Sequence, residues 1–105
     1  MLSHLPLFCK LCLFVILAIT TNLTQASEIK KGKELYNTYC ADCHGATGVS
    51  IMPDAPNFAK NEGLIKSDFE LYDAISKGNN AMPLYQGILS DQEILDVIAY
   101  IRTLN

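Results

Sequence analysis

Five consecutive residues, Cys40-Ala41-Asp42-Cys43-His44, constrain this chain more than any other part of it. Cysteines at positions i and i+3 project from the same side of a helical turn, so both sulfur atoms can reach one partner. The imidazole of His44 follows directly and is placed next to that side. The motif therefore brings two thiols and one metal-binding nitrogen together, and the fold has to leave space beside them.

The first part of the chain has the pattern of a secretory signal. Nine apolar residues, 11–19, follow Lys10 without a break, and a polar run with small residues comes next. Nine helical residues span about 14 Å, well short of the roughly 30 Å hydrocarbon core of a membrane. We therefore expect a signal peptide over residues 1–26, cleaved after Ala26, and one domain over residues 27–105. An uncleaved anchor is the alternative, because few charges precede the apolar run.

The remaining 79 residues can bury only a limited core, and domains of this size often need a disulfide, a metal or a cofactor. They hold seven Lys and Arg against eleven Asp and Glu, a net charge of −4 that argues against nucleic acid as a partner. Cys9 and Cys12 leave with the signal, so Cys40 and Cys43 remain. A disulfide between these two would close a very short loop and stabilise little.

Apolar spacing predicts an all-α domain of three or four short helices wrapped around something else. The first helix is expected from about Gly32 to Cys43, where apolar residues recur on one stripe. Capping-box sequences at Ser67 and Ser90 predict two further helices, and Gly78 is suited to end the first of them. The last helix carries an apolar arc that is wide enough to pack against two different surfaces.

The spacing Cys-x-x-Cys-His is the pattern for covalent attachment of haem. Export is consistent with haem attachment, because a pair of free thiols outside the cytosol would tend to oxidise. A structural zinc site needs four ligands, and the only other histidine, His4, lies in the signal. A thioredoxin-like pair would need a βαβ context, and a plain disulfide leaves His44 unexplained. We therefore expect one haem c, attached to Cys40 and Cys43, with its iron bound by His44.

Two methionines compete for the second axial position of that iron. Met82 lies in a proline-marked loop, thirty-eight residues after His44, which lets the chain pass around the porphyrin edge. Pro83 disfavours the helical region for Met82 and keeps it extended. Met52, also followed by proline, comes only eight residues after His44. On local sequence alone, filling a gap is an equally good explanation of a loop methionine.

Together these features resemble the class I c-type cytochromes, a family of small soluble monohaem proteins with many short bacterial members. The resemblance covers residues 27–105 and includes the attachment motif and the last helix. Gly32 and Tyr36 are similar to the glycine and aromatic with which the family's first helix crosses its last, here at Val97 and Tyr100.

The same resemblance has implications for the haem site. The turn Ala55-Pro56-Asn57-Phe58 is similar to one in which a proline carbonyl accepts a hydrogen bond from the ligand histidine, here His44. It also favours Met82 over Met52 as the second iron ligand. Three aromatic residues are candidates for the pocket wall, with ordinary core packing as the alternative: Phe69, Tyr72 and Tyr85.

The predicted function is one-electron transfer in the periplasm or another exported compartment, between redox donor and acceptor proteins such as membrane or periplasmic respiratory enzymes. Two strong axial ligands leave no position for a substrate, so the protein is expected to be a carrier and not an enzyme. The alternatives are a dedicated haem subunit of an oxidoreductase complex and, with a labile sixth ligand, a small haem enzyme or gas sensor. Composition does not separate a free carrier from a subunit.

Overall fold

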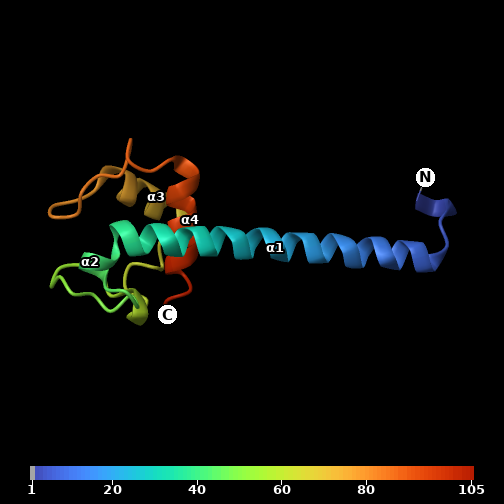
Figure 1. Cartoon of the computed structure of the whole chain (residues 1–105), viewed down its shortest axis with the longest axis horizontal. Coiled ribbons are helices and arrows are strands. Elements are labelled where there is room, and N and C mark those ends of the chain that lie inside the picture. The colour runs from blue at the N-terminus through green and yellow to red at the C-terminus, as the bar shows by residue number, and fades with distance from the viewer. Residues whose placement is uncertain (1) are drawn as a thin grey trace.

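One long helix, α1 (Leu7–Tyr39), carries the chain from its N-terminal segment into a group of shorter helices (Figure 1). The computed structural model describes residues 2–105. The other elements, in chain order, are η1 (Leu2–His4), α2 (Ala41–His44), η2 (Phe58–Lys60), α3 (Asp68–Lys77) and α4 (Asp91–Ile101), where η marks a 3-10 helix. Over the described residues there is no strand, and β-type pairing amounts to two isolated bridges in the loop between α3 and α4. The prediction of an all-α fold is confirmed.

Both predicted capping boxes are present. The Ser67 hydroxyl accepts the Glu70 N–H at 3.3 Å, and the Glu70 carboxylate accepts the Ser67 N–H at 2.7 Å. Ser90 and Glu93 repeat this exchange at the start of α4. Each box satisfies backbone N–H groups that a helix start otherwise leaves without partners. Gly78 ends α3 with φ +67°, as the sequence predicts.

Helix α4 is buried on a broad face. Ile94, Val97 and Ile98 are almost completely buried, because α4 packs against α1 and also against α3. This double packing explains the wide apolar arc. The helix ends at Ile101, so Leu104 lies in the following turn, although it still packs against the core.

The start of the first helix differs from the prediction. Helix α1 begins at Leu7, directly after Pro6, and runs through Ala26 without interruption. No glycine or proline lies between Leu7 and Lys31, so nothing in the sequence stops the helix before the domain begins. Among the described residues, no helix is both long and apolar enough to cross a membrane.

Helices α1 and α4 cross in close contact at Gly32. A Cβ atom at this position would overlap the Asp96 carbonyl oxygen and lie 3.0 Å from the Tyr100 Cβ. One turn later Tyr36 is completely buried, and its ring meets that of Tyr100 edge to face at 5.3 Å. The crossing of Gly32 and Tyr36 with the last helix is therefore confirmed.

Replacing Gly32 with alanine should lower the free energy of unfolding by about 1–3 kcal/mol, because the new methyl group forces the two helices apart. The helix propensity of alanine acts in the opposite direction by roughly 1 kcal/mol. The comparison is chemical denaturation followed by circular dichroism, with the exposed Asn37→Ala on the same helix as the control. A Gly32→Ala protein more stable than the parent would show that the crossing has room for a methyl group.

Candidate functional site

The cysteine–histidine motif forms the single turn that follows α1. Cys40 ends α1 and begins α2, and its carbonyl oxygen accepts the N–H groups of Cys43 at 3.3 Å and His44 at 2.9 Å. This turn leaves both thiols half-buried and the His44 ring buried. The structure thus brings the three predicted residues together on α2 and the residue that caps its start.

His44 is fixed by a hydrogen bond and by a stacked ring. Its Nδ1 lies 3.3 Å from the Pro56 carbonyl oxygen, and its ring stacks on Phe58 at 4.5 Å between centroids. Burial lowers the pKa of His44, and the Pro56 hydrogen bond partly offsets that shift. A neutral ring that donates from Nδ1 keeps the lone pair on Nε2, which is the form that binds iron. The contact between His44 and Pro56 that the family resemblance implied is present.

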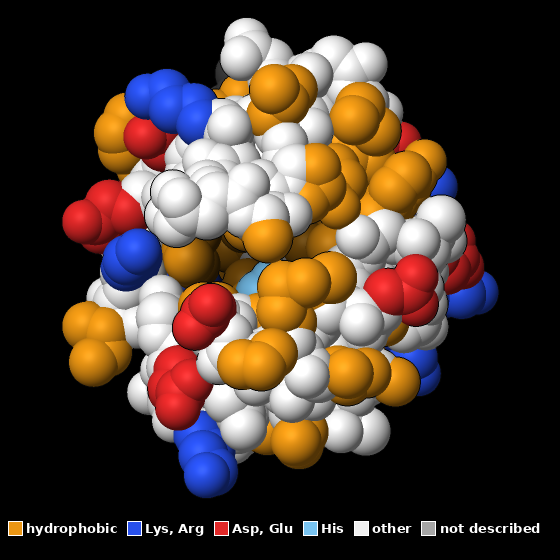
Figure 2. All heavy atoms as spheres, turned by 90° about the vertical axis from the view of Figure 1, so that its left-hand side faces the viewer, with side chains coloured by type: hydrophobic (Ala, Val, Ile, Leu, Met, Phe, Trp, Pro, Cys, Tyr) orange, Lys and Arg blue, Asp and Glu red, His pale blue; other side chains and the backbone are white. Residues whose placement is uncertain are grey.

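A pocket lies beside this turn, and α1, α2, η2, α3, α4 and the loop between α3 and α4 contribute residues to its wall. Figure 2 shows a histidine side chain at the bottom of a hollow whose rim is mostly hydrophobic. The lining residues are Tyr36, Cys40, His44, Phe58, Ile75, Met82, Val97 and Ile101. The wall therefore combines a thiol, an imidazole and a thioether with otherwise apolar or aromatic groups.

The two candidate methionines lie in different surroundings. Met82 is half-buried and lines the pocket together with His44. Its loop turns back on itself through reciprocal backbone hydrogen bonds with Asn79, at 2.9 and 3.1 Å. Met52 is 37% exposed, and its N–H donates to the Cys43 carbonyl oxygen, so its loop folds against α2. Only Met82 belongs to the pocket wall described here.

The three aromatic residues expected at the pocket do not line it. Phe69 is 77% exposed at the start of α3, so its prediction as a pocket residue is wrong. The Tyr72 hydroxyl donates to Asp91 at 2.8 Å, and the Tyr85 hydroxyl donates to the Tyr39 carbonyl oxygen. The aromatic residues that line the pocket with His44 are Tyr36 and Phe58. Sequence alone gave Phe58 only as part of a turn, and its contact with His44 depends on how that turn folds back.

Tyr36 connects α1 with the loop after the motif. Its hydroxyl donates to the Gly45 carbonyl oxygen at 2.7 Å, in a buried position. Burial is the main reason that the pKa of Tyr36 is raised to about 12, with smaller contributions from Cys40 and Tyr100. The hydroxyl is therefore a proton donor at all physiological pH values, which this buried hydrogen bond requires.

The properties of the thiols distinguish between the possible chemistries. Burial, with a smaller effect of Cys43, raises the pKa of the Cys40 thiol to about 11, whereas a reactive redox thiol needs a low pKa. Over the described residues, no three His, Cys, Asp or Glu side chains are grouped as a metal site would require. Two thiols on one turn, a neutral imidazole and an apolar wall fit a covalently attached haem.

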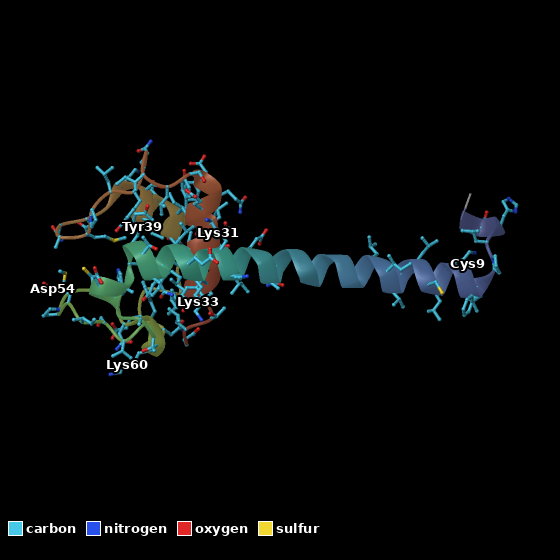
Figure 3. All side chains as sticks on the ribbon, in the orientation of Figure 1. Cys9, Lys31, Lys33, Tyr39, Asp54 and Lys60 are labelled. Carbon is cyan, nitrogen blue, oxygen red and sulfur yellow. The ribbon has the colours of Figure 1, made fainter. Side chains whose placement is uncertain are left out.

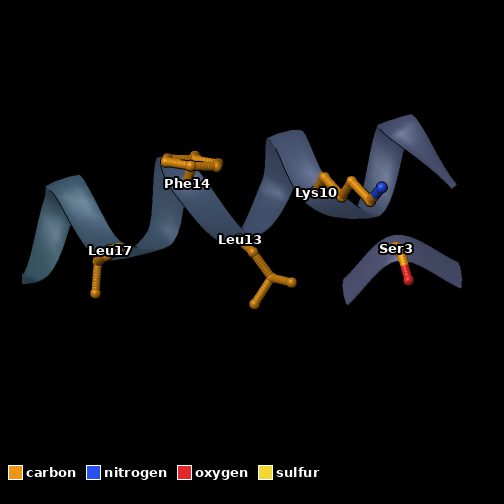
Figure 4. Close-up of a pocket in the computed structure, with 5 residues that line it drawn as sticks. All are labelled: Ser3, Lys10, Leu13, Phe14 and Leu17. Carbon is orange, nitrogen blue, oxygen red and sulfur yellow. The ribbon is translucent and has the colours of Figure 1, made fainter. Parts of the chain in front are cut away.

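A second cysteine pair with the same spacing does not form such a site. Cys9 and Cys12 are exposed, and Cys9 lies at the end of α1 that is far from the pocket (Figure 3). Leu13 follows Cys12 in place of a histidine. A cavity of about 440 Å³ lies close by (Figure 4). The described residues that line it include no cysteine or histidine: they are Ser3, Lys10, Leu13, Phe14 and Leu17.

Comparison with known proteins gives consistent matches. Residues 27–101 match the family model described as cytochrome C oxidase, cbb3-type, subunit III. Cytochrome c6 of Gracilaria tenuistipitata var. liui is 32% identical over 84% of this chain and 86% of its own length. Cytochrome c6 of Thermosynechococcus vestitus is 34% identical, over 90% of this chain and 88% of its own. A cytochrome c6-like protein of Nostoc sp. is 34% identical, over 90% and 89%.

Replacing Tyr36 with phenylalanine should destabilise the protein by about 1–3 kcal/mol, because the buried Gly45 carbonyl oxygen loses its partner. Thermal unfolding measures the change. Tyr72→Phe is the matched control, since its hydroxyl bonds an exposed carboxylate that water can solvate. Equal effects of the two substitutions would mean that the bond between Tyr36 and Gly45 adds nothing beyond an exposed contact.

Proposed function

Because this chain belongs to the family of small monohaem c-type cytochromes, we propose that it carries single electrons through a haem c bound by Cys40, Cys43, His44 and Met82. One observation carries the proposal: His44 and Met82 line the same apolar pocket, with Cys40 in its wall. The covalent haem is a property of the family, and the assignment of these residues to it is ours.

The two proposed axial ligands, His44 and Met82, suit a protein that carries electrons. The bound haem supplies an iron couple that gains and loses one electron. The imidazole of His44 is a strong donor, and the thioether of Met82 favours ferrous iron and raises the reduction potential. When both axial positions are filled by protein side chains, no position remains for a substrate, so the protein passes electrons on without further chemistry.

The surroundings of the pocket suit transient contact with redox proteins. The loops on both sides expose large apolar side chains: Val49 and Ile51 in one, Leu84 and Ile88 in the other. Figure 2 shows hydrophobic side chains on several sides of the hollow, with an acidic side chain at one point of its rim. We assign this surface to donors and acceptors such as membrane or periplasmic respiratory enzymes.

Export is part of the proposal. The family match starts at residue 27, directly after the proposed cleavage site at Ala26. Before that site α1 exposes large apolar side chains, among them Leu7 at 83% and Phe14 at 75%. Both observations support a leader that is removed on export, and with it a carrier that works in the periplasm or another exported compartment.

The name of the matched family supports a second candidate, a haem subunit fixed to one oxidoreductase complex. We favour a free carrier, because the matches to individual cytochromes c6 span 86% and 88% of those proteins. Isolation from the native host in mild detergent distinguishes the two, since a subunit copurifies with its complex at a fixed ratio.

Replacing Met82 with alanine should remove the sulfur-to-iron charge-transfer absorption of the oxidised protein. The reduction potential should fall, because a ligand that favours ferrous iron is lost, and the ferrous iron should then bind carbon monoxide. Visible spectra with and without carbon monoxide, together with redox titration, measure all three properties.

The matched control is Met52→Ala, which should leave these three properties nearly unchanged and cost about 0.5–1 kcal/mol of stability at a half-exposed position. If Met52→Ala has the effects expected of Met82→Ala, the ligand assignment is wrong. If unmodified ferrous protein binds carbon monoxide readily, the carrier proposal itself fails.

Protein purified from the native host should begin at Ser27, because the leader is removed during export. Intact-mass spectrometry decides the point. A mass that includes residues 1–26 would instead indicate an anchored cytochrome that keeps the full length of α1.

A further inference from the structure

One peptide group joins the carboxylate of Glu62 to the ring of His44. The Pro56 carbonyl and the Asn57 N–H belong to the same peptide plane. At one edge of this plane, the carbonyl oxygen lies 3.3 Å from His44 Nδ1. At the opposite edge, the Asn57 N–H donates to Glu62 Oε2 at 2.7 Å. The contacts therefore run without a gap from imidazole to peptide to carboxylate.

The turn around η2 holds the carboxylate in this position. The Glu62 N–H donates to the Asn57 carbonyl oxygen at 3.1 Å, so Asn57 and Glu62 bond each other twice. The Lys60 N–H donates to the Asn57 side chain, and Asn61 adopts a left-handed φ of +63°. These backbone hydrogen bonds close the turn, and the closed turn holds the Glu62 carboxylate next to the Asn57 N–H.

The charge of the Glu62 carboxylate affects the His44 ring through the peptide group between them. A carboxylate that accepts a peptide N–H at 2.7 Å forms a charge-assisted hydrogen bond, the stronger kind. Hydrogen bonds in a chain polarise one another, so negative charge at the N–H makes the carbonyl oxygen of the same peptide a better acceptor. A stronger acceptor on Nδ1–H makes the opposite ring nitrogen a better donor to a metal.

We infer that Glu62 is a positioning residue for His44, which fixes the plane of the Pro56–Asn57 peptide and strengthens the imidazole as an iron ligand. A stronger imidazole donor stabilises ferric iron more than ferrous iron, so Glu62 lowers the reduction potential. The inference rests on the proposed role of His44 as a ligand. It assigns a function to a surface carboxylate that lies at least eighteen residues along the chain from each proposed haem-binding side chain.

A simpler explanation is that Glu62 only closes the turn. Glu62 is exposed, and water weakens the electrostatic effect of exposed charges. That explanation predicts a change in stability and no change at the His44 ring. The experiment therefore needs a signal from the Nδ1 proton as well as a melting curve.

The test uses the full haem-loaded protein with Glu62→Ala, Glu62→Gln and, as the control, Asp54→Asn. Asp54 is an exposed carboxylate two residues before Pro56, with no hydrogen bond to the peptide (Figure 3). Glu62→Gln keeps an acceptor for the Asn57 N–H and removes only the charge. It therefore maintains the turn if Glu62→Ala disturbs it.

Both Glu62 variants should raise the reduction potential more than Asp54→Asn does, by up to about tenfold in the equilibrium constant for reduction, or 59 mV for one electron. In the diamagnetic ferrous protein, the NMR signal of the His44 Nδ1 proton should move upfield in both variants, because its hydrogen bond weakens. Melting temperatures should stay close together for Glu62→Gln and Asp54→Asn.

Two results would overturn the inference, in different ways. If the Glu62 variants melt earlier but match Asp54→Asn in potential and in the Nδ1 proton signal, Glu62 only closes the turn. If the unmodified protein shows no iron-shifted signals from the His44 ring, His44 is not a ligand. The proposed function then fails together with the inference that rests on it.

Discussion

The contact of α1 and α4 at Gly32 determines where every other part of the site can lie. Because no side chain separates the helices there, Tyr36 reaches the Tyr100 ring one turn later, and Cys40, directly after α1, lies at the pocket wall. α4 then supplies Val97 and Ile101 from the opposite side. The position of the attachment turn relative to the core is thus set by a helix crossing, and the loops only have to close around it.

Two loops complete the site, and each is held by its own backbone hydrogen bonds. The loop after α2 returns to the motif through the Ile51 and Met52 N–H groups, which both donate to the Cys43 carbonyl oxygen. It then presents the Pro56 carbonyl to His44. The loop after α3 reverses at Asn79 and brings Met82 to the pocket. One loop thus fixes the ring of His44, which α2 carries, and the other brings a methionine to the same pocket.

Local signals in the sequence were sufficient where a few adjacent residues determine the result. A few adjacent residues determine the capping boxes at Ser67 and Ser90, and the structure has both where predicted. The same holds for the single turn that carries the cysteine–histidine motif. The start of α1 was missed because the segment before Gly32 contains no residue that stops a helix. The contact of Phe58 with His44 could not be predicted from spacing, since it forms only when the η2 turn folds back on α2. The bond from the Asn57 N–H to Glu62 depends on how that turn closes on itself. Phe69 fits the helical apolar pattern but faces solvent, because burial depends on what packs opposite.

The nearly apolar wall of the pocket has a consequence for the speed of electron exchange. Among the described residues of that wall, the two hydrogen-bonding rings, Tyr36 and His44, already donate to fixed backbone carbonyl groups. When the charge at the centre of the pocket changes by one unit, few dipoles nearby are free to rotate. These fixed donors therefore rearrange less with each electron than freely rotating dipoles in the same wall would. A domain of this kind can exchange electrons in both directions between partners whose potentials differ only slightly.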